Sequence, residues 1–556
     1  MQKVFPYAFI FVAAGLLFFS FLGHVHLFDW DEINFAECAR EMIVSKDYLR
    51  AQIDFMPFWE KPPFFIWMQV LSMKIFGVGE FAARFPNALT GVITLVSVYY
   101  IGKRVHNEKI AFWWSLLFAA SWLPHIYFKS GIIDPVFNLF IFAAFYQIWT
   151  LKSSKQPTLH AAAAGLLLGM AVLTKGPVAI LIAVISLIAY LVINRGLNGY
   201  KVKHLFLVAL TASIPMLFWM AAAVASHGIA YGKWFMSEFV TYQIRLFSTE
   251  DADHGGPFFY HFIVLLIGCF PASIFLFQYI GKRNTGQPKT NDFTRWMWIL
   301  FWVVLILFSI VKTKIVHYSS LCYFPLTYLA ALQLAQLSYD PRKFKKSVKV
   351  LLLSIGTIVS ILIGALPLVG LYKQKLIPYI EDPFAVGNLA ADIPWSGIEC
   401  CWGILYLVGI WISAMYMRKN FRNGMIALCV CQIIIIQVAV IHFTPKVEGY
   451  TQRAAIEYFQ GFEGKDVYVK PLDYMSYAHL FYSNKSATAN QNYYSYKHNN
   501  KGEATSPEAN EGWLLTGNID KPAYFICKIQ DKKKFLAMSQ LEQIGEKNGF
   551  AFFKRK

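Results

Sequence analysis

Acidic side chains crowd one short segment that follows the first long apolar run. The segment 28–42 carries Asp29, Asp31, Glu32, Glu37 and Glu41, although only 33 of the 556 residues are acidic. Carboxylates can deprotonate or orient an acceptor group, or hold a metal ion. Capping of a following helix is the competing explanation, because acidic residues also stabilise a helix N-terminus.

Further ionisable groups follow at intervals beside later apolar runs. They include Glu60-Lys61 before Pro62-Pro63, Asp134, Lys175, Arg245, His254, and Lys314 close to Tyr318. Ionisable residues in or next to membrane spans are costly and are therefore functional candidates. Plainer roles compete at some positions, since Asp134 precedes a proline as helix starts often do and Lys175 precedes a Gly-Pro turn.

Both signs of charge are expected at one membrane surface. Cations suit recognition of a lipid-linked phosphate, and carboxylates suit activation of an acceptor. A mixture of cations and carboxylates suits transfer of a group from a phosphate-bearing lipid better than either sign of charge alone.

The composition excludes an ordinary soluble protein. Hydrophobic residues make up 56% of the chain and charged residues only 15%, against about a quarter charged in soluble domains. Apolar runs long enough to cross a hydrocarbon core of about 30 Å recur along the chain. We therefore predict an all-α polytopic membrane bundle. The net charge of +18 does not indicate nucleic-acid binding, because basic inner loops alone can generate it.

We predict about thirteen transmembrane helices, and hence a transmembrane domain over residues 1–444. They are placed at 5–28, 84–103, 110–124, 134–151, 159–175, 177–194, 204–227, 257–281, 296–311, 317–337, 347–372, 396–417 and 424–443. With the N-terminus inside, the inner loops are short and basic, as the positive-inside rule requires. The acidic segments and the C-terminus then lie outside.

Two outer regions stand apart from the spans. The first outer loop, about 29–83, should carry helices at 33–43 and 64–76 that lie along the membrane interface. Residues 445–556 should form a small soluble α/β domain, with helices at 451–462 and 532–547 and a polar loop at 484–511. Its strands are predicted at 466–470, 480–483, 513–516, 523–528 and 550–554. A lid or structural cap is its expected role.

The order of these motifs resembles the C-type membrane glycosyltransferases, within them the group of lipid A aminoarabinose transferases and protein O-mannosyltransferases. The resemblance covers about residues 1–340. It rests first on Asp31-Glu32 and Glu60-Lys61-Pro62-Pro63, and then on Asp134-Pro135, Lys175-Gly176-Pro177, the run from His254 to Tyr260, and Lys314 before Tyr318.

The resemblance implies an inverting transferase that uses a polyprenyl-phosphate sugar on the periplasmic face of a bacterial inner membrane. Asp31, Glu32 and Asp134 would be catalytic, while Lys61, Lys175, Arg245 and Lys314 would bind the donor phosphate. Glu60, His254 and Tyr318 would line the cavity. No cofactor is assigned; a divalent cation, with Glu60 and His254 as its candidate ligands, stays open. A monomer is expected.

The acceptor stays open between lipid A, a glycan and a protein. Asn34 and Phe35 stand where the aminoarabinose transferases carry Arg and Tyr, and an Arg would suit an anionic acceptor. A lipid or anion transporter is the alternative from another class, and it predicts charges near mid-span and related halves. A purely structural membrane protein would leave the acidic first loop unexplained.

Overall fold

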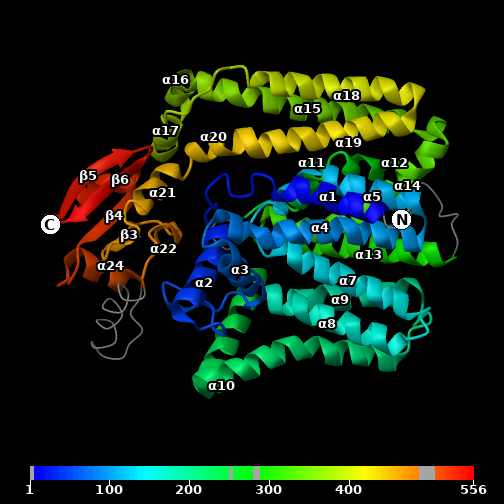
Figure 1. Cartoon of the computed structure of the whole chain (residues 1–556), viewed down its shortest axis with the longest axis horizontal. Helices are drawn as coiled ribbons and strands as arrows, with labels where there is room; N and C mark the ends of the chain where they lie inside the picture. The colour runs from blue at the N-terminus through cyan, green and yellow to red at the C-terminus, as the bar shows by residue number, and fades with distance from the viewer. Residues whose placement is uncertain (1–4, 249–254, 280–287, 487–506) are drawn as a thin grey trace.

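The computed structural model describes residues 5–248, 255–279, 288–486 and 507–556. Long helices run side by side through the body of the molecule, and a small sheet domain projects from one end (Figure 1). The helix α1 begins at the opposite end of this bundle from the sheet domain (Figure 1).

The bundle is built from apolar helices joined by short turns. Its first part comprises α1 (Phe5–Phe19), α4 (Glu80–Val105), α5 (Glu108–Ala120), α6 (Trp122–Tyr127), α7 (Asp134–Leu151), α8 (Pro157–Lys175), α9 (Val178–Ile193) and α10 (Val202–Ser248). The second part comprises α11 (Tyr260–Gly268), α12 (Leu276–Tyr279), α13 (Pro288–Ile310), α14 (Tyr323–Tyr339), α15 (Lys346–Leu371), α18 (Cys400–Lys419) and α19 (Phe421–Val438). Short connecting turns are η1 (Ala272–Phe275), η2 (Val316–Cys322), η3 (Pro341–Lys343), η4 (Ile377–Tyr379), η5 (Ala439–Phe443) and η6 (Ile529–Asp531), with α16 (Lys373–Leu376) and α17 (Pro383–Leu389).

Among the described residues, seven helices are long and apolar enough to cross a membrane, or eight if one bent pair counts as a span. The protein is therefore a multi-span membrane protein, as predicted, while the count of about thirteen stays a prediction. The difference arises because several predicted spans form shorter helices. One is α1, whose 15 residues extend only about 22 Å.

Two predicted spans have a different shape. The span at 257–281 is bent by 109° between α11 and the following helical segment, so a single straight helix there is wrong. The span at 204–227 continues in α10 to Ser248, with a break at Gly228, where φ is +85°. A residue without a Cβ accommodates this backbone conformation, which turns the last part of α10 toward the first outer loop.

The first outer loop contains α2 (Asp31–Ser45), the hairpin β1 (Gln52–Ile53) with β2 (Met56–Pro57), and α3 (Phe64–Phe76). Both predicted helices are present, but α2 does not have an exposed polar face. Residues 32–42 are all buried, because the helix lies between α3, the end of the bundle and the sheet domain. Its polar side chains therefore need partners inside the protein.

The C-terminal region contains α20 (Thr444–Gly449), α21 (Arg453–Gln460), α22 (Ala478–Tyr482), α24 (Pro507–Thr516) and α25 (Lys532–Leu536). Its strands β3 (Tyr468–Leu472), β4 (Ala523–Lys528), β5 (Leu541–Lys547) and β6 (Phe550–Arg555) form one sheet in the order β3-β4-β6-β5. Only the β3–β4 pair in that sheet is parallel.

Three predictions in this region are wrong. The segments 480–483 and 513–516 belong to the helices α22 and α24, not to strands, and the predicted helix 532–547 divides into α25 and β5. Short apolar runs do not distinguish strand from helix by their periodicity, so tertiary packing decides between them.

Candidate active site

A cavity of about 620 Å³ lies where the first outer loop meets the ends of the bundle helices. Its ionisable lining residues are Asp29, Asp31, Glu32, Glu60, Lys61, Lys175, Arg245 and His317. Tyr127, Tyr242 and Tyr318 also line it. This volume is within the usual range for small-molecule sites, about 300–1,000 Å³. The charged residues predicted from the sequence therefore largely meet in one place.

Asp31 is the first residue of α2 and its carboxylate is 43% exposed. Its Oδ2 atom lies 3.5 Å from Nε2 of His317. The same nitrogen lies 3.7 Å from Oδ2 of Asp134. One imidazole therefore lies between two carboxylates that come from distant parts of the chain, and Asp31 is the more exposed of the two.

Asp134 begins α7, and its side chain is only 3% exposed. Its Oδ1 atom accepts a hydrogen bond of 2.6 Å from Nζ of Lys175, the last residue of α8. The Lys175 ammonium also lies 5.0 Å from the ring centroid of Tyr318. Asp134 is therefore placed beside the cavity as the partner of Lys175, and its charge compensates the lysine in a partly buried position.

Lys61 and Arg245 converge on Tyr242. The Lys61 ammonium is 3.4 Å from the Tyr242 hydroxyl and 4.8 Å from its ring centroid. The Arg245 guanidinium lies 5.4 Å from the same ring. The tyrosine face attracts both cations, which brings two positive charges from the first loop and from the end of α10 to one wall of the cavity.

Glu32 does not have the geometry of a catalytic acid. Its carboxylate forms two hydrogen bonds, of 2.9 and 2.8 Å, with Arg84, and also accepts from the backbone N–H groups of Phe28 and Gly131. Burial alone would favour its protonated form, but the charge of Arg84 and these hydrogen bonds lower its pKa. These bonds engage both of its oxygens and indicate a structural role, although Glu32 also lines the cavity; its catalytic role stays a prediction.

Lys314 is also placed differently from the prediction. It does not line the cavity; its ammonium donates to the backbone oxygens of Phe308 and Ser309 at the end of α13, and to Val311. A cation satisfies the unpaired carbonyls at a helix C-terminus and interacts favourably with its dipole. In this structure Lys314 therefore caps α13, and its role at the donor phosphate stays a prediction.

The remaining predicted residues concern the cavity wall and a metal ion. Glu60 and Tyr318 line the cavity, whereas His254 lies outside the described residues. Within the described ranges no group of three or more His, Cys, Asp or Glu side chains is arranged to hold a metal ion.

The sequence predicts His317 as one of the ionisable groups near the site without a role of its own, and it does not predict Tyr242 or Arg84 there. His317 is the second residue of η2 and lies next to Tyr318, after Lys312 and Lys314, and this position is its only signal in the sequence. Arg84 begins an otherwise apolar span, and a buried arginine in such a place needs an anionic partner. For Tyr242 the sequence holds no comparable signal.

The bundle, its buried first outer loop, a charged cavity at the helix ends and an adjoining soluble domain together define the fold of a C-type membrane glycosyltransferase. Solved structures share this fold. ArnT from Cupriavidus metallidurans bound to undecaprenyl phosphate superposes with a TM-score of 0.77 at 17% identity, covering 99% of this chain and 98% of that chain. The oligosaccharyltransferase of Archaeoglobus fulgidus in its apo form gives 0.52 at 13% identity, covering 97% and 71%.

Sequence comparison points to the same proteins. The family described as "Dolichyl-phosphate-mannose-protein mannosyltransferase" matches residues 60–219. The undecaprenyl phosphate-α-4-amino-4-deoxy-L-arabinose arabinosyl transferase of Edwardsiella ictaluri is 29% identical over 432 residues, or 72% of this chain and 76% of that protein. The corresponding enzyme of Wigglesworthia glossinidia brevipalpis is 27% identical over 62% of this chain and 60% of its own length. The predicted resemblance to the C-type membrane glycosyltransferases is thus confirmed.

Proposed function

We infer that the protein is an inverting membrane glycosyltransferase that moves a sugar from a polyprenyl-phosphate donor to an acceptor. The similar arabinosyl transferases are named for undecaprenyl phosphate-linked aminoarabinose, so this donor is the first choice, with lipid A as the first acceptor to test. The observation that carries the proposal is the cavity that the exposed Asp31 carboxylate lines together with Lys61, Lys175 and Arg245.

In the proposed reaction an acceptor oxygen attacks the anomeric carbon of the donor sugar. The bond between that carbon and the phosphate oxygen breaks, and its electron pair leaves with the polyprenyl phosphate. Lys61 and Arg245 would stabilise the negative charge that develops on the phosphate. Asp31 would accept the proton of a hydroxyl acceptor; with an already ionised phosphate acceptor it would orient the nucleophile instead.

The position of the charged groups favours this reaction over transport. Asp31, Asp134 and Lys175 lie at helix ends, in the first or last turn of their helices. A transporter predicts its coupling and substrate groups near mid-span. We place the cavity on the periplasmic side of the bacterial inner membrane, because the short basic loops predicted from the sequence belong inside.

The test combines cells and purified protein. Mass spectrometry of lipid A, glycoproteins and surface glycans from a deletion strain would identify the acceptor. The purified full chain is then assayed with undecaprenyl phosphate-linked aminoarabinose and that acceptor. We expect Asp31→Asn and Lys61→Ala to lose at least about 100-fold in transfer, with wild-type amounts of folded protein in the membrane.

Two variants outside the cavity serve as matched controls. Asp392→Asn removes an exposed carboxylate, and Lys74→Ala removes an ammonium that also lies over a tyrosine ring, that of Tyr48, at 4.2 Å. Both should transfer sugar like the wild type. Near-normal transfer by Asp31→Asn would reject the proposed role of this carboxylate, and wild-type protein without any sugar product would reject the activity itself.

A further inference from the structure

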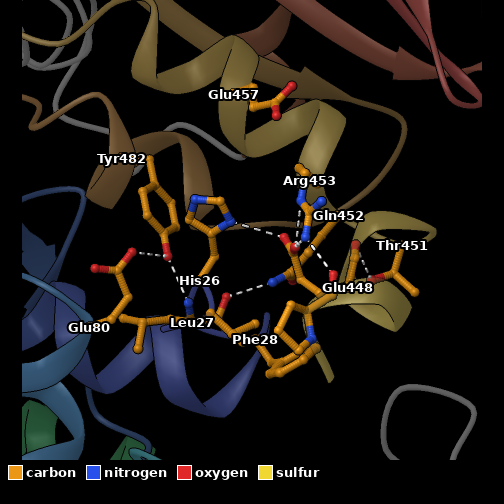
Figure 2. A network of polar contacts seen from close by, with 12 residues as sticks. His26, Leu27, Phe28, Glu80, Glu448, Thr451, Gln452, Arg453, Glu457 and Tyr482 are labelled. Atoms are coloured by element: carbon orange, nitrogen blue, oxygen red, sulfur yellow. Dashed lines mark hydrogen bonds and ion pairs between the residues drawn. The ribbon is translucent and has the colours of Figure 1, made fainter. Parts of the chain in front are cut away.

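The backbone just ahead of Asp31 is held from two sides. On the bundle side, the Arg84 guanidinium donates to the backbone oxygens of Val25 at 2.7 Å and His26 at 2.9 Å. On the other side, residues 26–29 contact the soluble C-terminal domain through a polar network (Figure 2). The segment 26–30 therefore lies at the junction between the two parts of the protein.

Gln452 makes the most specific of these contacts. Its side-chain amide donates to the Leu27 oxygen at 2.8 Å, and its carbonyl accepts from the Asp29 N–H at 3.2 Å. One side chain thus binds the backbone on both sides of Phe28, as Figure 2 shows for the Leu27 bond. This pairing fixes both the position and the direction of the segment.

Tyr482 holds the same segment from α22. Its hydroxyl accepts from the Leu27 N–H at 2.7 Å and donates to the Glu80 carboxylate at 3.2 Å (Figure 2). Glu80 is the first residue of α4. The tyrosine therefore links the soluble domain, the segment and the membrane bundle through a single oxygen atom.

The loop before α22 adds two further contacts. Burial raises the pKa of the Asp29 carboxyl group, and Ser476 and the backbone of Tyr477 beside it act in the opposite direction. Met475 lines the cavity itself. The soluble domain thus reaches from the backbone ahead of Asp31 to the cavity wall.

The path from this segment to Asp31 is short and rigid. Asp31 directly follows the segment, and the Trp30 oxygen accepts from the Asn34 N–H at 2.8 Å, which makes Trp30 the cap of α2. A shift of residues 27–30 would therefore shift the start of the helix. The cationic groups that line the same cavity come from other elements and would not follow that movement.

We propose that the soluble C-terminal domain is a working part of the active site, in which Gln452 and Tyr482 are positioning residues that fix the segment carrying Asp31. This role rests on the proposed function. It differs from that of a lid, because it acts on the orientation of the acceptor-activating carboxylate and not on access to the cavity. Loss of these contacts should slow the chemical step and leave donor binding intact.

The test is a comparison of Gln452→Ala and Tyr482→Phe in the full chain. Misplacement of a reacting group by about 1 Å can cost about 100-fold in rate. We therefore expect kcat to fall about 10- to 100-fold, with the KM for undecaprenyl phosphate-linked sugar within about threefold of the wild type. Direct binding of undecaprenyl phosphate should also be unchanged.

The chain offers close controls for both variants. Gln460→Ala changes an exposed glutamine at the end of the same helical region. Tyr458→Phe removes a hydroxyl bonded to the oxygens of Phe525 and Phe553 within the soluble domain. Both should keep kcat within about twofold. The double variant of Gln452 and Tyr482 should lose little more than the worse single variant, because both act on one segment.

Several results would overturn the positioning role. They are an unchanged kcat in both variants, a rise in KM with unchanged kcat, or a loss that follows the amount of unfolded protein and appears equally in Tyr458→Phe. An active wild type with unaffected variants rejects only the positioning role. An inactive wild type rejects the proposed function and this role together.

Discussion

Replacing Glu32 by glutamine should make the protein easier to unfold, whereas replacing its neighbour Asp31 by asparagine should not. The Glu32 and Arg84 side chains are only 5% and 6% exposed and share two hydrogen bonds. Removing one partner of a buried ion pair costs about 3–5 kcal/mol, because the other charge stays buried without compensation. Arg84 keeps three backbone oxygens as acceptors, so we expect the lower end, about 3 kcal/mol.

Thermal unfolding of the full chain in detergent, followed by tryptophan fluorescence, measures this change. Glu32→Gln should unfold several degrees below the wild type, and the folded fraction should keep measurable transfer. Asp31→Asn should transfer no sugar. It should still unfold at the wild-type temperature, since the Asp31 side chain is 43% exposed. Glu108→Gln is the control, because it breaks an exposed ion pair with Lys103 and should leave the unfolding temperature unchanged.

The same pair predicts an acid dependence. The pKa of Glu32 is lowered from its ordinary value of 4.5, so the stabilisation is present above that value and is lost as the pH falls through the lower value in the folded protein. The Glu32→Gln variant should lack this part of the acid destabilisation. If the variant unfolds like the wild type but transfers no sugar, Glu32 is catalytic and the structural assignment is wrong.

Three further outcomes test other parts of the structure. Because Lys314 binds helix carbonyls, Lys314→Met should lower the free energy of unfolding by about 1–3 kcal/mol, seen as a lower unfolding temperature. The KM for the donor should be unchanged, and a raised KM would place this lysine at the phosphate site. Gly169→Leu should reduce the yield of folded protein, because even a Cβ at this position would lie 2.5 Å from a backbone oxygen of α10. A wild-type yield of this variant would contradict the close packing of α8 and α10. The pKa of Asp54 is lowered from 3.8, since Lys485 and other cations outweigh its burial. This link between the first loop and the soluble domain should therefore weaken below about pH 4. Proteolysis should then increase in the wild type but not in Lys485→Met, and equal cleavage of both would refute the link.

Much of the bundle could be predicted because proline and charge mark its boundaries. The helices at 64–76 and 134–151 begin and end where the sequence indicates, after Pro63 and at Asp134-Pro135. The C-terminal domain was harder. Its short apolar segments became α22 and α24 because they pack against the first loop and the sheet, and these contacts are not visible in local periodicity.

The sequence predicts that these charged residues lie together at the candidate site, but it does not predict the separate role of each residue. The predicted topology brings Asp31, Lys61 and Lys175 to one surface, and all three line the cavity. Neighbouring residues of a helix, however, point about 100° apart. Both carboxylates line the cavity, but Arg84 binds that of Glu32 and Asp31 stays exposed. The Asp-Glu pair in the sequence does not indicate which carboxylate is bound and which is exposed.

One histidine lies between Asp31 and Asp134, the partner of Lys175. Nε2 of His317 lies at nearly equal distances from Asp31 and Asp134, 3.5 and 3.7 Å, and one N–H can be directed at only one carboxylate at a time. Lys175 binds Oδ1 of Asp134, whereas the oxygen that faces His317, Oδ2, is buried and has no hydrogen-bond partner. Within the proposed reaction, an N–H directed at Asp31 would hold Oδ2 and leave Oδ1 for the acceptor, while Lys61 and Arg245 receive the phosphate.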